Sequence, residues 1–156
     1  MAHMNDNAER HLTEYVTVTI GDHLFGLPIA RVQDVFVPDR LTRVPLAPPE
    51  VAGILNLRGR IVTAIDMRSR LQLGARSPGQ PTMAIGIEFK GESYGLLVDQ
   101  VGEVMPLDSG ACEAKPANLD PCLARVAAGI YRLEGQLMIV LDVDRVLEIK
   151  GGAIAA

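Results

Sequence analysis

The apolar pattern begins with a period of two. Residues 15–20 alternate between apolar side chains and threonine or tyrosine, which is typical of a strand with one buried face. Residues 21–22, Gly-Asp, predict a hairpin turn, and residues 23–29 are expected to form the returning strand. A stretch with four prolines, 38–49, then predicts a loop, because proline interrupts regular structure.

A second hairpin and a set of later elements follow the same pattern. Two apolar runs, 53–57 and 60–65, flank Arg58-Gly59 and predict a tight turn. Asp66 precedes residues 67–71, where its carboxylate is expected to cap a short helix. Residues 107–125 are expected to form a loop. The second half predicts strands at 82–89, 93–98, 101–105, 126–133 and 136–141, with a final helix over 143–149.

These patterns repeat within the chain. Residues 25–35 return 69 positions later as 94–104, and residues 53–66 return 76 positions later as 129–142. The shared order indicates an internal duplication. Short strands, frequent turns and no long amphipathic helix predict a mostly β fold of two small closed barrels, about 14–73 and 82–150. Barrels of this size are marginal alone, so we expect them to share a core or exchange elements.

Composition and charge narrow the class of protein. The chain has 156 residues and 48% apolar content, enough for a packed core. A net charge of −4, with only 15 lysines and arginines, argues against nucleic-acid binding. The chain shows neither a signal-peptide profile nor a membrane-spanning apolar run, so we expect a cytoplasmic protein without membrane insertion. Residues 1–13 are expected to be a tag remnant, Met1 to His3, and a flexible leader, and residues 151–156 a tail.

Residues capable of catalysis or metal binding are few. Cys112 and Cys122 lack metal-ligand spacing and are interpreted as ordinary thiols. His23 beside a turn is interpreted as a solvated residue rather than a general base. Asp66 and its repeat partner Asp142 are interpreted as helix caps. The sequence therefore predicts no enzyme, cofactor or metal site, and leaves a small-ligand sensor or an enzymatic double barrel as the alternative.

Differences between the two copies point to residues that the shared fold does not explain. Asn56 and Arg58 of the first hairpin correspond to Arg132 and Glu134 in the second. Neither is required by the turn geometry in our interpretation, and Arg58 is equally compatible with partner recognition and with a solvated turn charge. In the segment 31–35, Val35 is expected in the core and Val32 at the edge of a groove.

Three blocks in this order resemble the CheW family of bacterial chemotaxis coupling proteins. They are residues 56–68, with the pattern Asn-Leu-Arg-Gly-x-Ile-Val-x-x-Ile-Asp-Met-Arg, residues 25–35 upstream, and residues 94–101 downstream. The resemblance covers about residues 14–150. It implies two SH3-like five-stranded barrels and a non-catalytic adaptor. Its partners would be the cytoplasmic tip of methyl-accepting chemoreceptors and the regulatory domain of the histidine kinase CheA, joined in membrane-associated signalling arrays.

The resemblance also implies which residues meet the partners. Kinase contacts would use the ends of both barrels. One departure is that Thr63-Ala64 stands where the family usually has Pro-Val, which leaves open a role in another chemosensory pathway, such as pilus motility. The groove between the barrels would bind the receptor and would be formed or supported by seven residues: Val32, Asp34, Val35, Gly53, Asn56, Arg58 and Gly59.

Overall fold

The computed structural model describes residues 12–74 and 79–149, and its strands form two five-stranded sheets. The expected tag remnant, most of the leader and the tail lie outside the described residues, whereas Leu12 and Thr13, expected in the leader, begin the first strand. The strands are β1 (Leu12–Ile20), β2 (His23–Pro28), β3 (Asp34–Phe36), β4 (Val51–Leu57), β5 (Arg60–Asp66), β6 (Met83–Phe89), β7 (Glu92–Val98), β8 (Gln100–Asp108), β9 (Ala127–Leu133) and β10 (Gln136–Leu141). The helices are η1 (Ile29–Arg31), α2 (Met67–Leu71), η2 (Ser109–Ala111), α3 (Pro121–Val126) and α4 (Val143–Val146).

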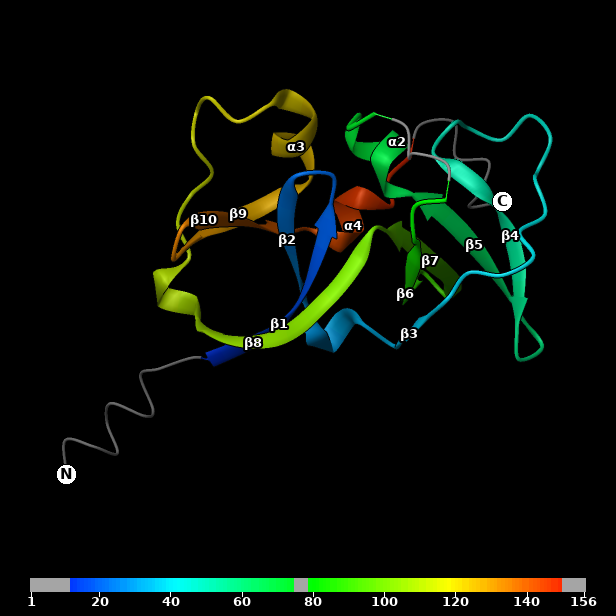
Figure 1. Ribbon diagram of the computed structural model, residues 1–156, viewed down its shortest axis with the longest axis horizontal. Coiled ribbons are helices and arrows are strands. Elements are labelled where there is room, and N and C mark those ends of the chain that lie inside the picture. The colour runs from blue at the N-terminus through cyan, green and yellow to red at the C-terminus, as the bar shows by residue number, and fades with distance from the viewer. Residues whose placement is uncertain (1–11, 75–78, 150–156) are drawn as a thin grey trace.

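Each sheet takes strands from both repeats. Sheet A has the order β8-β1-β2-β10-β9, and sheet B has the order β3-β6-β7-β5-β4. The sheets therefore do not follow the expected barrel extents of 14–73 and 82–150, because the first hairpin of each repeat pairs with strands of the other. Sheet B is formed by the continuous segment 34–98, and sheet A by the parts of the chain on either side of it. Figure 1 shows the two units side by side.

The exchange is reciprocal, since matched strands occupy matched places. In sheet A, β2 pairs in parallel with β10, where Phe25 faces Ile139. In sheet B, β7 pairs in parallel with β5, where Tyr94 faces Thr63. Each sheet is closed further by a bridge from the loop after its edge strand: Thr42 pairs with Ile54, and Glu113 with Ile130. The mostly β fold and the duplication are thus confirmed.

One apolar core joins the two sheets. It contains Phe25 of sheet A, Ile65 and Leu96 of sheet B, and Met67 and Val146 of α2 and α4, all almost inaccessible to water. Two smaller clusters lie at matched positions, one in each unit, around Val62 in sheet B and Met138 in sheet A. Burying apolar surface from both units in one core fixes their relative placement.

A buried ion pair also ties the units together. Arg68 of α2 donates to both oxygens of Asp99, at 3.0 Å and 2.6 Å, and the Gly21 amide in the β1–β2 turn donates to the same carboxylate at 2.8 Å. The hydrogen bonds from Arg68 to Asp99 raise the pKa of Arg68 above its ordinary value, so it remains charged. A more exposed pair lies at nearly matched positions with the charges reversed: Arg31 of η1 lies 2.9 Å from Asp144 of α4.

Candidate functional site

The β4–β5 hairpin ends in a two-residue turn formed by Arg58 and Gly59. Leu57 pairs with Arg60, and the two residues between them have φ values of 52° and 84°. Positive φ at both central positions defines a type I′ turn, whose twist matches the flanking strands. The Asn56 side chain accepts a hydrogen bond from the Gly59 amide at 2.8 Å. The geometry therefore does use Asn56, contrary to the sequence interpretation.

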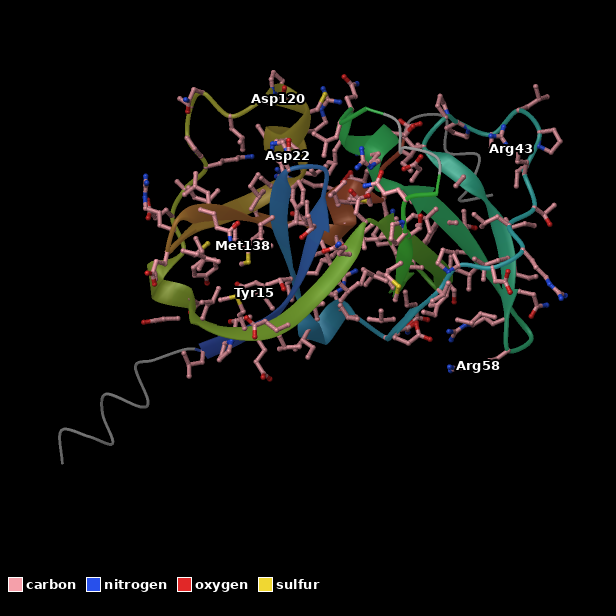
Figure 2. The ribbon with its side chains drawn as sticks, in the orientation of Figure 1. Tyr15, Asp22, Arg43, Arg58, Asp120 and Met138 are labelled. Atoms are coloured by element: carbon pink, nitrogen blue, oxygen red, sulfur yellow. The ribbon has the colours of Figure 1, made fainter. Side chains whose placement is uncertain are left out.

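The turn fixes the backbone conformation of Arg58, whereas its side chain is not fixed by any contact with a described residue. Arginine in the left-handed region carries a steric cost that asparagine or glycine avoids. The side chain is exposed at the end of the hairpin (Figure 2), and no hydrogen bond or ion pair engages it among the residues that the structure describes. An exposed guanidinium that no neighbouring residue engages can bind a carboxylate or a backbone carbonyl of a partner.

Asp34 of β3 lies in a different part of sheet B. It pairs with Gly86 of β6, and the missing side chain of Gly86 leaves the space that the Asp34 carboxylate occupies, since a Cβ there would collide with Oδ1. This Oδ1 is buried and has no hydrogen-bond partner among the described residues. The next residue, Val35, is 42% exposed, so its expected place in the core is wrong. Val32 is half-buried and packs against the shared core.

Gly53 has a structural role. A Cβ at this position would lie 2.5 Å from the carbonyl oxygen of Thr42, in the bridge that joins the loop to β4.

This loop and the hairpin border a cleft of about 440 Å³, lined by Asp39 and Arg40 on one side and by Asn56 and Ile61 on the other. Ile61 is 59% exposed and was not among the predicted site residues. The repeat comparison gave no signal for it, because its counterpart Leu137 is also apolar.

Exposed apolar residues gather on the same unit. In the part of the chain that the structure describes, ten large apolar side chains are exposed, and six of them lie between residues 35 and 61. Such a gathering on a folded surface is typical of a protein–protein contact, whereas scattered single residues are not informative. The six are Val35, Val37, Leu41, Val44, Leu46 and Ile61.

Comparison with known proteins agrees with this architecture. A family model described as CheW-like domain matches residues 14–150, nearly the whole described chain. The chain belongs to the CheW-like domain family. Among relatives named chemotaxis protein CheW, that of Rhizobium meliloti (strain 1021) is 28% identical, and the match covers 90% of this chain and 93% of the relative. That of Klebsiella aerogenes is also 28% identical, with coverage of 86% and 81%.

A solved structure extends the comparison to three dimensions. The scaffolding protein TtCheW from Thermoanaerobacter tengcongensis superposes with a TM-score of 0.80 at 29% identity, covering 90% of this chain and 91% of that one. The likeness over nearly the whole of both chains supports the CheW-like arrangement of the two sheets. The CheW family consists of chemotaxis adaptors and scaffolds.

Within the CheW-like fold, the predicted site residues form two groups. Val32, Asp34 and Val35 lie in and just before β3, and the remaining four lie in the β4–β5 hairpin. β3 and β4 are the two edge strands of sheet B, joined by the loop that contains Thr42. Both groups therefore belong to one unit of the CheW-like domain and are connected through its loop.

The described residues contain no group of three or more histidine, cysteine or acidic side chains placed to hold a metal ion. In the same part of the chain, no helix is long and apolar enough to cross a membrane. The features present at the candidate site are an unengaged guanidinium, an unpaired carboxylate oxygen and exposed aliphatic side chains. This arrangement is suited to binding another protein.

Proposed function

We propose that this chain is a non-catalytic adaptor that couples methyl-accepting chemoreceptors to the histidine kinase CheA. The observation that carries the proposal is the exposed, apolar Val35 beside the half-buried carboxylate of Asp34 on β3, an edge strand of sheet B. An edge strand that presents an apolar side chain next to a charged one offers a partner protein both apolar contact and an acceptor for hydrogen bonds. Family membership supports this class of partner, and the surface chemistry of β3 supports a contact at this strand.

The receptor-binding surface in this proposal consists of the seven predicted residues in three roles. Asp34 and Arg58 form hydrogen bonds and ion pairs, and Val32 and Val35 supply apolar contact. Asn56, Gly53 and Gly59 hold the hairpin in shape. The exposed guanidinium of Arg58 supports this assignment, because no described residue engages it, whereas the ammonium of Lys90 in the matching turn lies over the Phe89 ring.

CheA is the second partner in this proposal, through its regulatory domain and the ends of the two units. The adaptor would be cytoplasmic and recruited to membrane-associated receptor arrays. This role rests on the family of chemotaxis scaffolds to which the chain belongs. It requires no chemistry from the adaptor, which holds receptor and kinase in a fixed geometry by binding alone.

The test is a binding measurement with the cognate receptor fragment and CheA. Arg58→Glu reverses the charge at the hairpin tip and is expected to weaken receptor binding at least tenfold, while CheA binding and the melting temperature stay unchanged. Lys90→Glu is the matched control, because Lys90 occupies the same kind of turn, with φ of 51°, between β6 and β7. Wild-type receptor affinity in Arg58→Glu would remove Arg58 from the site, and failure of the wild-type protein to bind either partner would refute the proposal.

A small-ligand sensor is the second candidate function, because one observation favours it. A cleft of about 390 Å³ lies in the unit that contains sheet A, with Asp22 and Asp120 in its lining. His23 also lines this cleft, and its buried Nδ1 has no hydrogen-bond partner among the described residues. A rise in melting temperature with any member of a metabolite panel would favour this candidate.

A further inference from the structure

A cleft of about 850 Å³ opens on sheet B between the loop that joins β3 to β4 and the start of α2. Its lining is mostly apolar, with Leu41, Val44 and Leu46 on the loop and Leu97 on β7. Leu46 is completely exposed, with a relative accessibility of 102%, and has a φ of 64°. An aliphatic side chain in the left-handed region and in water is unfavourable on both counts. No described part of the chain covers it.

In the second repeat, equivalent backbone hydrogen bonds fix the two ends of the corresponding loop. In the first repeat, the Asp66 amide donates to the Glu50 carbonyl at 2.8 Å, and in the second the Asp142 amide donates to the Val126 carbonyl at 2.8 Å. The other end of each loop is fixed by the bridges of Thr42 and Glu113. The two loops are therefore held at equivalent points, and their contents can be compared directly.

The two loop segments between these fixed points differ in length. Seven residues, 43–49, separate the fixed points in the first repeat, and twelve residues, 114–125, separate them in the second. The longer loop contains α3, which Asp120 caps and Pro121 begins. Leu123 and Val126 of α3 are 3% and 0% exposed and enter the shared core. The second repeat thus fills its own loop region with a short helix, and the first repeat lacks one.

Charge indicates what kind of partner fits the open cleft. The segment that forms sheet B, 34–98, carries eight cations and six anions, a net charge of +2, whereas segments 12–33 and 99–149 together carry five and eleven, a net charge of −6. Two charged residues line the cleft: Arg43 is exposed, whereas Asp66 is half-buried and its carboxylate accepts from the Arg68 amide at the start of α2, which leaves Arg43 as the more accessible charge. Figure 2 shows Arg43 and Arg58 at opposite ends of this unit. An acidic partner could therefore bind the cleft without overlapping the hairpin tip.

We infer that this cleft docks a short amphipathic helix from an acidic partner protein. The helix would present two aliphatic side chains three residues apart, as Leu123 and Val126 are in α3, and a carboxylate towards Arg43. Its aliphatic side chains would pack against Val44 and Leu46, in the way that helices bind apolar grooves. The site goes beyond the proposed coupling of receptor and kinase, because it lies away from Arg58 and Asp34.

The probe is a peptide that copies residues 118–126 of this chain, blocked at both ends, with Cys122→Ser and Arg125→Glu. It keeps the Asp120 cap, the two aliphatic residues and an added carboxylate. Titration into the ¹⁵N-labelled full chain is expected to shift the amide resonances of the non-proline residues in 41–52 and of Ser69, with saturation. The same peptide with Leu123→Asn is expected to bind at least tenfold more weakly.

Variants of the protein assign the contact. Leu46→Ser replaces a fully exposed side chain and leaves the fold intact; it is expected to weaken peptide binding at least tenfold without changing receptor affinity. Arg43→Glu is expected to reverse the preference, so that the peptide retaining Arg125 binds better than the one with Arg125→Glu. Arg58→Glu is expected to bind the peptide as the wild type does, which separates this site from the proposed receptor surface.

Three results would overturn the inference. The first is the absence of shifts at the highest soluble peptide concentration. The second is a set of shifts confined to other regions, such as the β4–β5 hairpin. The third is concentration-dependent dimerisation in sedimentation that Leu46→Ser removes, since the occupant would then be a second copy of this chain.

Discussion

At the scale of single residues, Arg58 combines a conformational cost with a proposed binding role. Arg58→Gly removes the cost of the left-handed backbone, and part of this gain is lost because glycine makes the unfolded chain more flexible. We expect the free energy of unfolding to rise by about 0.5–1 kcal/mol, measured by urea denaturation, and receptor binding to weaken. A variant that is more stable and still binds the receptor normally would contradict the role of the side chain.

Lys90 provides the matched control for this comparison. Lys90-Gly91 has φ values of 51° and 80°, close to those of Arg58-Gly59. Lys90→Gly should therefore also raise stability, by somewhat less than Arg58→Gly because it removes the contact of the Lys90 ammonium with the Phe89 ring, 5.2 Å from the ring centroid, and it should not affect receptor binding. If Arg58→Gly and Lys90→Gly weakened receptor binding equally, the cause would be a general effect of the glycine substitution and not the loss of the Arg58 side chain.

The two ion pairs between the units, Arg68–Asp99 and Arg31–Asp144, differ in burial, so their contributions to stability can be compared. Asp99→Asn removes the negative charge that accepts two hydrogen bonds from the buried Arg68, and we expect a loss of about 3 kcal/mol in the free energy of unfolding. Asp144→Asn breaks the exposed pair with Arg31 and should cost no more than about 1 kcal/mol. Chemical denaturation of both variants checks the prediction, and equal losses would contradict the difference in burial.

The sequence predicts some of these residues and not others, for physical reasons. Arg58-Gly59 was correctly predicted as a tight turn because the signal is local: glycine between two apolar runs. The unpaired oxygen of Asp34 was not predictable, because it depends on Gly86, which strand pairing alone brings opposite it. The exposure of Val35 was missed for the same reason, since period-two patterns do not reveal which face is covered.

At the scale of elements, Gly53 controls how closely the loop approaches β4. Gly53→Ala would place a Cβ 2.5 Å from the backbone oxygen of Thr42, which cannot move without breaking the bridge. We expect a loss of about 1–3 kcal/mol, measured by thermal or urea unfolding.

Gly129 is the matched position in the second repeat. A Cβ there would lie 2.6 Å from the Sγ of Cys112, a side-chain atom that can move, and 3.0 Å from the Glu113 carbonyl oxygen. Gly129→Ala should therefore cost less than Gly53→Ala. The reverse order would show that the loop of the first repeat is the more adaptable one.

The elements themselves were predicted best where the pattern was long. The returning strands of the first two hairpins, β2 and β5, begin at His23 and Arg60, where the sequence predicts them. Asp66 and Asp142 accept hydrogen bonds at the starts of α2 and α4, as expected. The helix α3 was missed, because Pro121 was interpreted as a loop residue although proline also suits the first position of a helix. The final helix ends at Val146, earlier than expected.

At the scale of the whole molecule, the shared core predicts cooperative unfolding. Sheet A and sheet B exchange hairpins and bury apolar residues in one cluster, so neither unit retains its core without the other. We expect a single transition in urea, with equal midpoints for circular dichroism and for amide exchange at Val18 in sheet A and Ile85 in sheet B. Separate midpoints for the two amides would contradict it.

Strand exchange also limits what the sequence can predict at this scale. Alternating residues show that a segment is a strand and which face is apolar, and the duplication shows that there are two units. Neither shows that β2 lies beside β10, because that pairing joins residues more than a hundred positions apart. The expectation that the units exchange elements came from their small size, which makes each unit marginal alone.

The topology has a consequence for the order in which the protein is made. Sheet B has all its strands once Val98 has left the ribosome, since residues 34–98 are continuous. The hairpin of β1 and β2 is synthesised before the other described elements, yet β2 waits for its parallel partner β10, which is the last of the described strands to appear. The outer edge of β1 can pair once β8 has emerged, but the outer edge of β2 stays unpaired in the nascent chain until β10 appears, exposed to wrong pairing or to chaperones. The strands that are synthesised first, β1 and β2, are therefore among the last to reach their final pairing.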